Sequence, residues 1–130
     1  MSSSPLEEVD LQRKAVEIAK KLFIGVYIPT EEEEEEEELG ITMTNLRNML
    51  DAAIDCEKKN NWDLFGLRVI FIARRASQGD DLYKFVSNLI REITESSKDT
   101  KERLKLAKYT LTACIYIFTA YRKGLHDLLR

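Results

Sequence analysis

The sequence predicts an all-α protein, a single bundle of five helices with a flexible acidic loop between the first and second helices. Apolar residues recur every three or four positions along five stretches, which is the spacing of one helix face. Five glycines and two prolines in 130 residues are too few for a turn-rich β architecture. The length fits one domain, residues 1–130, and no apolar run reaches the roughly 20 residues of a membrane span.

The first helix is expected within residues 1–26. Ser4, Pro5 and Glu7 form a capping box at its start, and Gly25 is the expected stop. Residues 27–41 contain eight consecutive glutamates, residues 31–38, and because adjacent like charges repel, we expect a flexible loop. Two interpretations of the glutamates stay open: a solvated insertion, which we favour, and an internal mimic of nucleic acid that shields a basic groove.

Four helices are expected in the remaining body, residues 42–130. Thr42 or Thr44 caps the second helix, and the Asn60-Asn61 pair separates it from the third, which Gly79 is expected to end. The fourth helix is expected to begin at Asp80 or Asp81 and to close at residues 96–98. Asp99 and Glu102 form a second capping box, which opens the longest helix, running to Lys123 with Gly124 as its C-terminal cap.

Charge is distributed unevenly between the two parts of the chain. Residues 1–40 have a net charge of −8 and residues 41–130 a net charge of +5, within an overall charge of −3. The basic body favours an anionic partner. The expected long helix places a stripe of polar and basic residues opposite its apolar side, with Lys105, Lys108 and Lys123 among them.

An apolar segment with arginines at both ends, residues 67–75, is the strongest single feature of the body. Arg68, Phe71, Ile72 and Arg75 would share one side of a helix. Arginine is rarely buried without a partner, so either acidic side chains or a phosphate ligand should satisfy this pair. Other arginines of the body are Arg47, Arg74 and Arg122. The alternative to phosphate is surface pairing with Asp51, Asp55 or Asp63, where each pair contributes little.

Residues for catalysis are scarce. Arg122 and His126 share a helix face, as in helical ribonucleases of the HEPN class, which leaves a ribonuclease as an alternative function. Cys56 and Cys114 are expected to be reduced core thiols of a cytoplasmic protein, and the cysteines and His126 do not form a metal-ligand cluster. We therefore predict a protein that is not an enzyme and has no cofactor or metal. A helical scaffold that contacts only protein is the other alternative.

Three motifs, taken in order, resemble the small subunit of type III CRISPR effector complexes, the Csm-type small subunit, and within it the III-D variant is a candidate. Residues 42–49 resemble its threonine-rich entry followed by Leu-Arg. Residues 67–75 are similar to its Lys-Leu-Ala-Tyr-x-x-x-Arg segment, with Arg68, Phe71 and Arg75 in place of the lysine, tyrosine and arginine. Residues 118–124 resemble its closing Ala-Tyr-His-Lys motif, with Arg122 in place of the histidine.

The resemblance implies a non-catalytic subunit of an RNA-guided antiviral complex. Its expected partners are guide RNA and target RNA, the backbone and large subunits of the complex, and copies of itself stacked head to tail, without a membrane. Shape-directed RNA binding works through phosphate and 2′-hydroxyl contacts. We predict that Arg47, Arg68, Arg75 and Lys123 contact nucleic acid, with Arg74, Arg122 and Lys108 as second choices.

Overall fold

The computed structural model describes residues 8–26, 28–33, 41–76 and 79–125. Within them the chain forms, in order, α1 (Glu8–Leu22), a turn of 3-10 helix η1 (Glu31–Glu33), α2 (Met43–Lys59), α3 (Trp62–Arg75), α4 (Gly79–Ser96) and α5 (Thr100–Arg122). Strands are absent from these residues. The prediction of an all-α bundle with five helices is confirmed.

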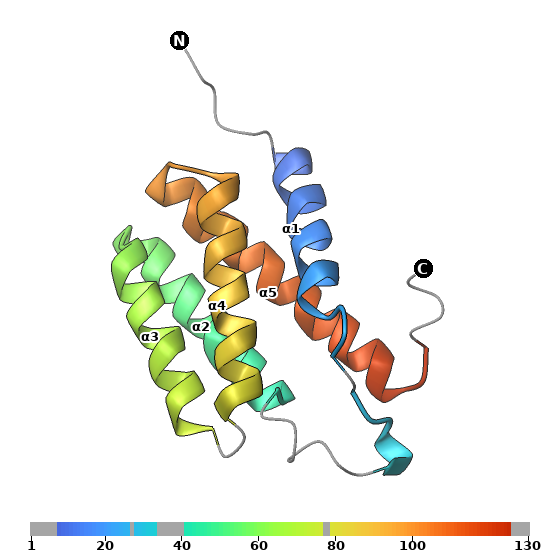
Figure 1. Cartoon of the computed structure of the whole chain (residues 1–130). Helices are drawn as coiled ribbons and strands as arrows, with labels where there is room; N and C mark the ends of the chain where they lie inside the picture. Colours follow the sequence, from blue (N-terminus) through green and yellow to red (C-terminus); the bar gives the residue numbers. More distant parts are fainter. Residues whose placement is uncertain (1–7, 27, 34–40, 77–78, 126–130) are drawn as a thin grey trace.

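The longest helix, α5, lies at the centre of the bundle. It packs most extensively against α1 and α2, while α3 lies between α2 and α4 at the edge farthest from α1 (Figure 1). The chain reverses direction between consecutive helices from α2 to α4. As a result α2 begins, α3 ends, α4 begins and α5 ends at the same end of the bundle.

Side-chain caps fix the start of α2 and the boundary between α2 and α3. The hydroxyl of Thr42 accepts a hydrogen bond from the backbone N–H of Asn45 at 3.1 Å, which satisfies one of the free donors at the start of α2. Asn60 ends α2 in the left-handed conformation, with φ of 51°, a region that asparagine tolerates better than most residues. Asn61 then caps α3 by accepting from the N–H of Leu64 at 3.0 Å. The predicted break at these two asparagines is confirmed.

The last helix begins and ends within one residue of the predicted positions, and the Asp99 side of the predicted capping box is present. Asp99 accepts a hydrogen bond from the N–H of Glu102 at 2.9 Å. Gly124 has a positive φ of 73° directly after the C-cap residue Lys123, which is the conformation that favours glycine after a helix.

One predicted boundary is wrong. Gly79 is the first residue of α4 and does not end α3, which stops at Arg75 with Ala76 in an extended conformation. The N–H of Ala76 bonds to the carbonyl of Ala73, so a single tight turn closes the helix without a glycine. The capping box predicted at Ser4 lies outside the described residues.

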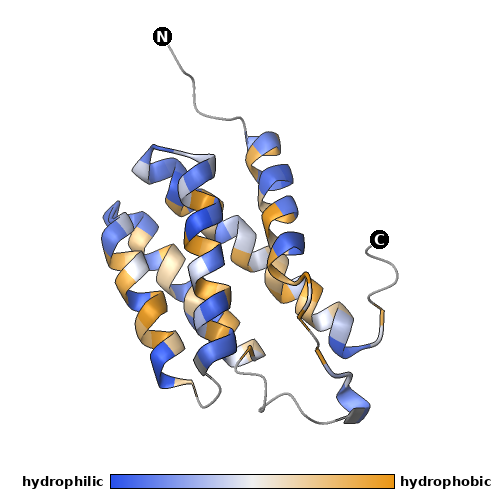
Figure 2. Ribbon diagram, viewed as in Figure 1, coloured by the Kyte–Doolittle hydropathy of each residue, from blue (hydrophilic) through white to orange (hydrophobic). Residues whose placement is uncertain are grey.

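The core forms where the apolar faces of the helices meet (Figure 2). Its largest fully buried side chains come from all five α-helices and from the segment just before α2, and include Ile18, Ile41, Leu46, Phe65, Leu89, Leu111 and Phe118. Burial of such side chains stabilises a fold by about 1.5–3 kcal/mol each. Among the described helices, none has the length and apolar character that crossing a membrane requires.

Candidate nucleic-acid interface

Five of the seven predicted contact residues lie toward one end of the bundle, in two groups on opposite sides of it (Figure 1). Arg47 lies near the start of α2, Arg74 and Arg75 close α3, and Arg122 and Lys123 close α5. The antiparallel course of the helices brings these positions to the same end, which we call the basic end (Figure 1). The basic residues in the last turns of α3 and α5 also interact favourably with the negative ends of the helix dipoles. Arg68 lies at the middle of α3 and Lys108 in the first half of α5, so both are away from the basic end.

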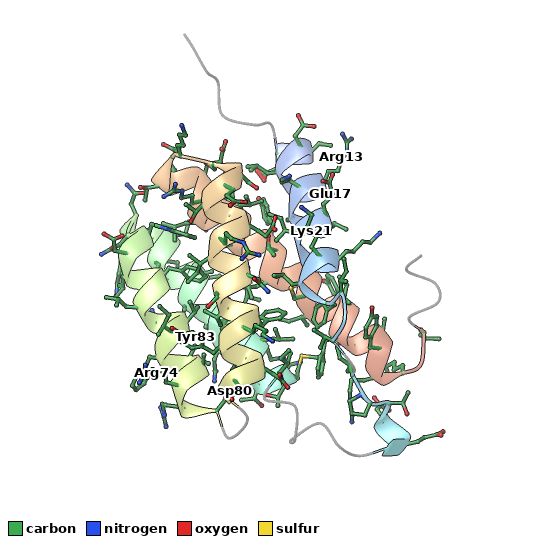
Figure 3. The ribbon with its side chains drawn as sticks, viewed as in Figure 1. Arg13, Glu17, Lys21, Arg74, Asp80 and Tyr83 are labelled. Atoms are coloured by element: carbon green, nitrogen blue, oxygen red, sulfur yellow. The ribbon has the colours of Figure 1, made fainter. Side chains whose placement is uncertain are left out.

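The α2–α3 half of the basic end presents exposed cations. Arg47, Arg74 and Arg75 are exposed, and none forms an ion pair with a described residue. The guanidinium carbon of Arg75 lies 5.4 Å from the ring centroid of Phe71, a cation–π contact. Figure 3 shows Arg74 on α3 at the same end of the bundle as Asp80, which lies in the first turn of α4. These three arginines remain available to an anionic ligand.

Arg68 has an acidic partner. Its Nη1 lies 2.7 Å from Oδ2 of Asp55 on α2, and Lys59 approaches the same oxygen at 3.1 Å. Hydrogen bonding by Lys59, reinforced by Arg68, holds the pKa of Asp55 below its ordinary value of 3.8, against the opposing effect of desolvation. The surface pairing considered as the alternative to phosphate therefore applies to Arg68.

Lys108 joins α5 to α2. Its Nζ lies 2.7 Å from Oε1 of Glu57, and both side chains are largely buried, with exposed fractions of 29% and 20%. Lys105, one turn away, pairs with Glu8 of α1 at 3.7 Å, and the hydroxyl of Tyr109 donates a hydrogen bond to the same carboxylate. The stripe of α5 is therefore partly neutralised by acids of its two neighbouring helices.

The α5 half of the basic end is covered by the segment that leads into the glutamate run. Nη1 of Arg122 donates hydrogen bonds to the carbonyls of Pro29 at 2.8 Å and Thr30 at 3.1 Å. Nζ of Lys123 lies 3.8 Å from Oε1 of Glu31. Arg122 is thus engaged by the backbone, while His126, its partner in the ribonuclease interpretation, lies outside the described residues.

Phe71 lies with Arg68 and Arg75 on the outer side of α3, as the spacing in the sequence predicted. Leu67 and Phe71 are 67% and 59% exposed. Beside them a groove of about 430 Å³ runs between α2 and α3, lined by Asn48, Asp51, Leu67, Arg68, Phe71 and Ile72. We call it the α2–α3 groove. The buried side of α3 is the opposite face, formed by Phe65, Val69 and Ala73.

The cysteine and acidic side chains of the described residues do not cluster as metal ligands. These residues hold no group of three histidine, cysteine, aspartate or glutamate side chains placed to share a metal ion. Both cysteines are free and buried, as predicted. Burial raises the pKa of the Cys114 thiol far above neutrality, so this sulfur is protonated and a poor nucleophile.

Comparison with protein families, curated proteins and solved structures gave no match for this chain.

Proposed function

We propose that this protein is a non-catalytic RNA-binding subunit that contacts the phosphate backbone through its basic end. The observation that carries the proposal is the group of three exposed arginines, Arg47, Arg74 and Arg75, without acidic partners among the described residues. Arginine presents a planar fork of donors that suits phosphate oxygens. The net charge of +5 on residues 41–130 acts in the same direction.

The seven predicted contact residues do not have equal roles in this proposal. Arg47, Arg74 and Arg75 are the primary contacts. Arg68 and Lys123 form solvent-accessible ion pairs with carboxylates, and a phosphate can replace the carboxylate in either pair at small cost. Lys108 and Arg122 are held by a largely buried carboxylate and by two backbone carbonyls, so we assign them to the fold.

The biological setting that we propose is the small-subunit position of a type III CRISPR effector complex in the cytoplasm. This rests on the resemblance of residues 42–49, 67–75 and 118–124 to that family. The partners are then guide RNA and target RNA, the backbone and large subunits, and head-to-tail copies of this chain, acting in antiviral defence. Purification from the native host tests the setting: recovery with these subunits and RNA supports it, and recovery with proteins alone favours a scaffold.

RNA binding itself is tested with a charge-matched pair of variants. In one, Arg47, Arg74 and Arg75 are changed to alanine. In the control, Arg13, Lys20 and Arg91, exposed cations on α1 and α4, are changed to alanine, which removes the same charge elsewhere. The measurement is the affinity for a labelled single-stranded RNA as a function of salt concentration.

We expect the first variant to bind more weakly and its log–log salt dependence to flatten by about 2, because each lost single-strand phosphate contact contributes about 0.7. The control should stay close to the unmodified protein. Equal losses in both variants would contradict a localised site. Degradation of RNA by the pure protein that disappears with His126→Ala would replace the proposal by the ribonuclease alternative.

A further inference from the structure

The α2–α3 groove combines an aromatic ring with hydrogen-bonding groups at the edge of the basic end. Phe71 and Leu67 form its apolar side, and both are more than half exposed. Asn48 and Asp51 of α2 form its polar side. The groove is an open depression of about 430 Å³ on the protein surface.

Charged groups of both signs lie along the groove. Asp51 within the groove, and Asp55 beside Arg68, repel a phosphate group. Arg75 at the end of α3 attracts one, and Arg68 at the middle does so when a phosphate replaces Asp55 as its partner. A nucleotide bound here is therefore oriented, with its phosphate toward the arginines and its uncharged base toward the carboxylate.

The Phe71 ring provides a surface on which a planar base can stack. Arg75 approaches the ring at 5.4 Å, and its own guanidinium can take part in the same stack. Stacking on aromatic side chains is how proteins hold the unpaired bases of single-stranded RNA, whereas a paired base inside a duplex presents no free face.

We propose that the α2–α3 groove binds one unpaired RNA base, which stacks on Phe71 and donates a hydrogen bond from an exocyclic amino group to Asp51. The proposal rests on the proposed RNA-binding function and adds a specificity to it. Carboxylates accept hydrogen bonds from the amino group of cytosine. Uracil has a carbonyl oxygen at that position, which a carboxylate repels, so the groove discriminates cytosine from uracil.

The test compares labelled oligocytidylate and oligouridylate of roughly 12 nucleotides, within the span of single-strand binding sites. The variants are Phe71→Leu, which removes the ring, Phe71→Tyr, which keeps it, and Asp51→Asn. Tyr83→Leu is the matched control, because Tyr83 is an exposed aromatic residue of α4 that does not line the groove (Figure 3).

We expect oligocytidylate to bind about two- to tenfold more tightly than oligouridylate, as one added hydrogen bond allows. Asp51→Asn should abolish the preference. Phe71→Leu should weaken both oligonucleotides about fivefold or more without changing the salt dependence, because a stack and not a phosphate contact is lost. Phe71→Tyr and Tyr83→Leu should bind like the unmodified protein.

The outcomes separate this inference from the proposed function. Equal binding of the two oligonucleotides, or unchanged binding by Phe71→Leu, overturns the base site even where the triple arginine variant still flattens the salt dependence. The absence of RNA binding by the unmodified protein overturns both. Self-association that Phe71→Leu weakens while RNA binding is unchanged would assign the groove to a protein contact instead.

Discussion

Nη1 of Arg68 lies 2.7 Å from Oδ2 of Asp55, and this ion pair joins α3 to α2. It neutralises a cation that the sequence predicted to contact RNA. Both side chains are partly exposed, with fractions of 39% and 42%. The pair is therefore accessible to solvent, and a phosphate can compete with Asp55 for Arg68.

The stability that Asp55 provides should depend on pH. Its pKa in the folded state is lowered below 3.8 by Lys59 and Arg68, so its contribution is fully present above that value and is lost as the pH falls through the lower folded-state pKa. Asp55→Asn should lower the urea midpoint at about pH 7, and the difference from the unmodified protein should shrink below about pH 4. A difference that stays constant down to about pH 2 would contradict this role.

Tyr109 should ionise later than an ordinary tyrosine. The hydrogen bond to Glu8, with desolvation, raises the pKa of Tyr109 to about 12. The neutral phenol therefore stabilises the fold below about pH 10, and this contribution is lost between about pH 10 and 12. In an ultraviolet titration of the five tyrosines, Glu8→Gln should lower the pKa of Tyr109 toward its ordinary value, and Tyr109→Phe should remove the latest transition. An identical titration curve for Glu8→Gln would show that the bond has no effect.

Thr110→Val should stabilise the protein by about 1 kcal/mol, because the buried Thr110 hydroxyl has no hydrogen-bond partner among the described residues. Valine has nearly the same shape and removes the cost of burying a hydroxyl. Thr112→Val on the same helix is the control, since the Thr112 hydroxyl donates to the carbonyl of Lys108 at 2.9 Å. In urea denaturation, Thr110→Val should therefore raise the free energy of unfolding and Thr112→Val should not. Equal effects of the two substitutions would contradict this explanation.

Glu31 should compete with RNA for Lys123. The ion pair between them spans 3.8 Å, and the chain before Glu31 is fixed to α5 by Arg122. Glu31→Gln should strengthen RNA binding about two- to fivefold at low salt, in keeping with one exposed pair, and the gain should vanish in a Lys123→Ala background. Glu17→Gln, an equal charge change on α1, should have little effect. A gain that persists without Lys123 would indicate general charge repulsion instead.

The helices were predictable because their signals are local. Thr42, Asn61 and Asp99 cap the helices that the sequence assigned to them, and each cap involves a residue only three positions away. The exception, Gly79, shows the limit of this reasoning. A glycine near a helix end fits either a C-terminal cap or the start of the next helix. Because the chain turns directly after Arg75, Gly79 starts α4.

The candidate site was predictable in composition but not in arrangement. The sequence alone identified the basic body, the list of arginines and lysines, and the five helices that carry them. Only the tertiary structure separated Arg47, Arg74 and Arg75 from the engaged cations, because the partners of Arg68, Lys108 and Arg122 are 13, 51 and 93 residues away in the chain. Such pairs depend on the packing register of the helices, which helical periodicity does not determine.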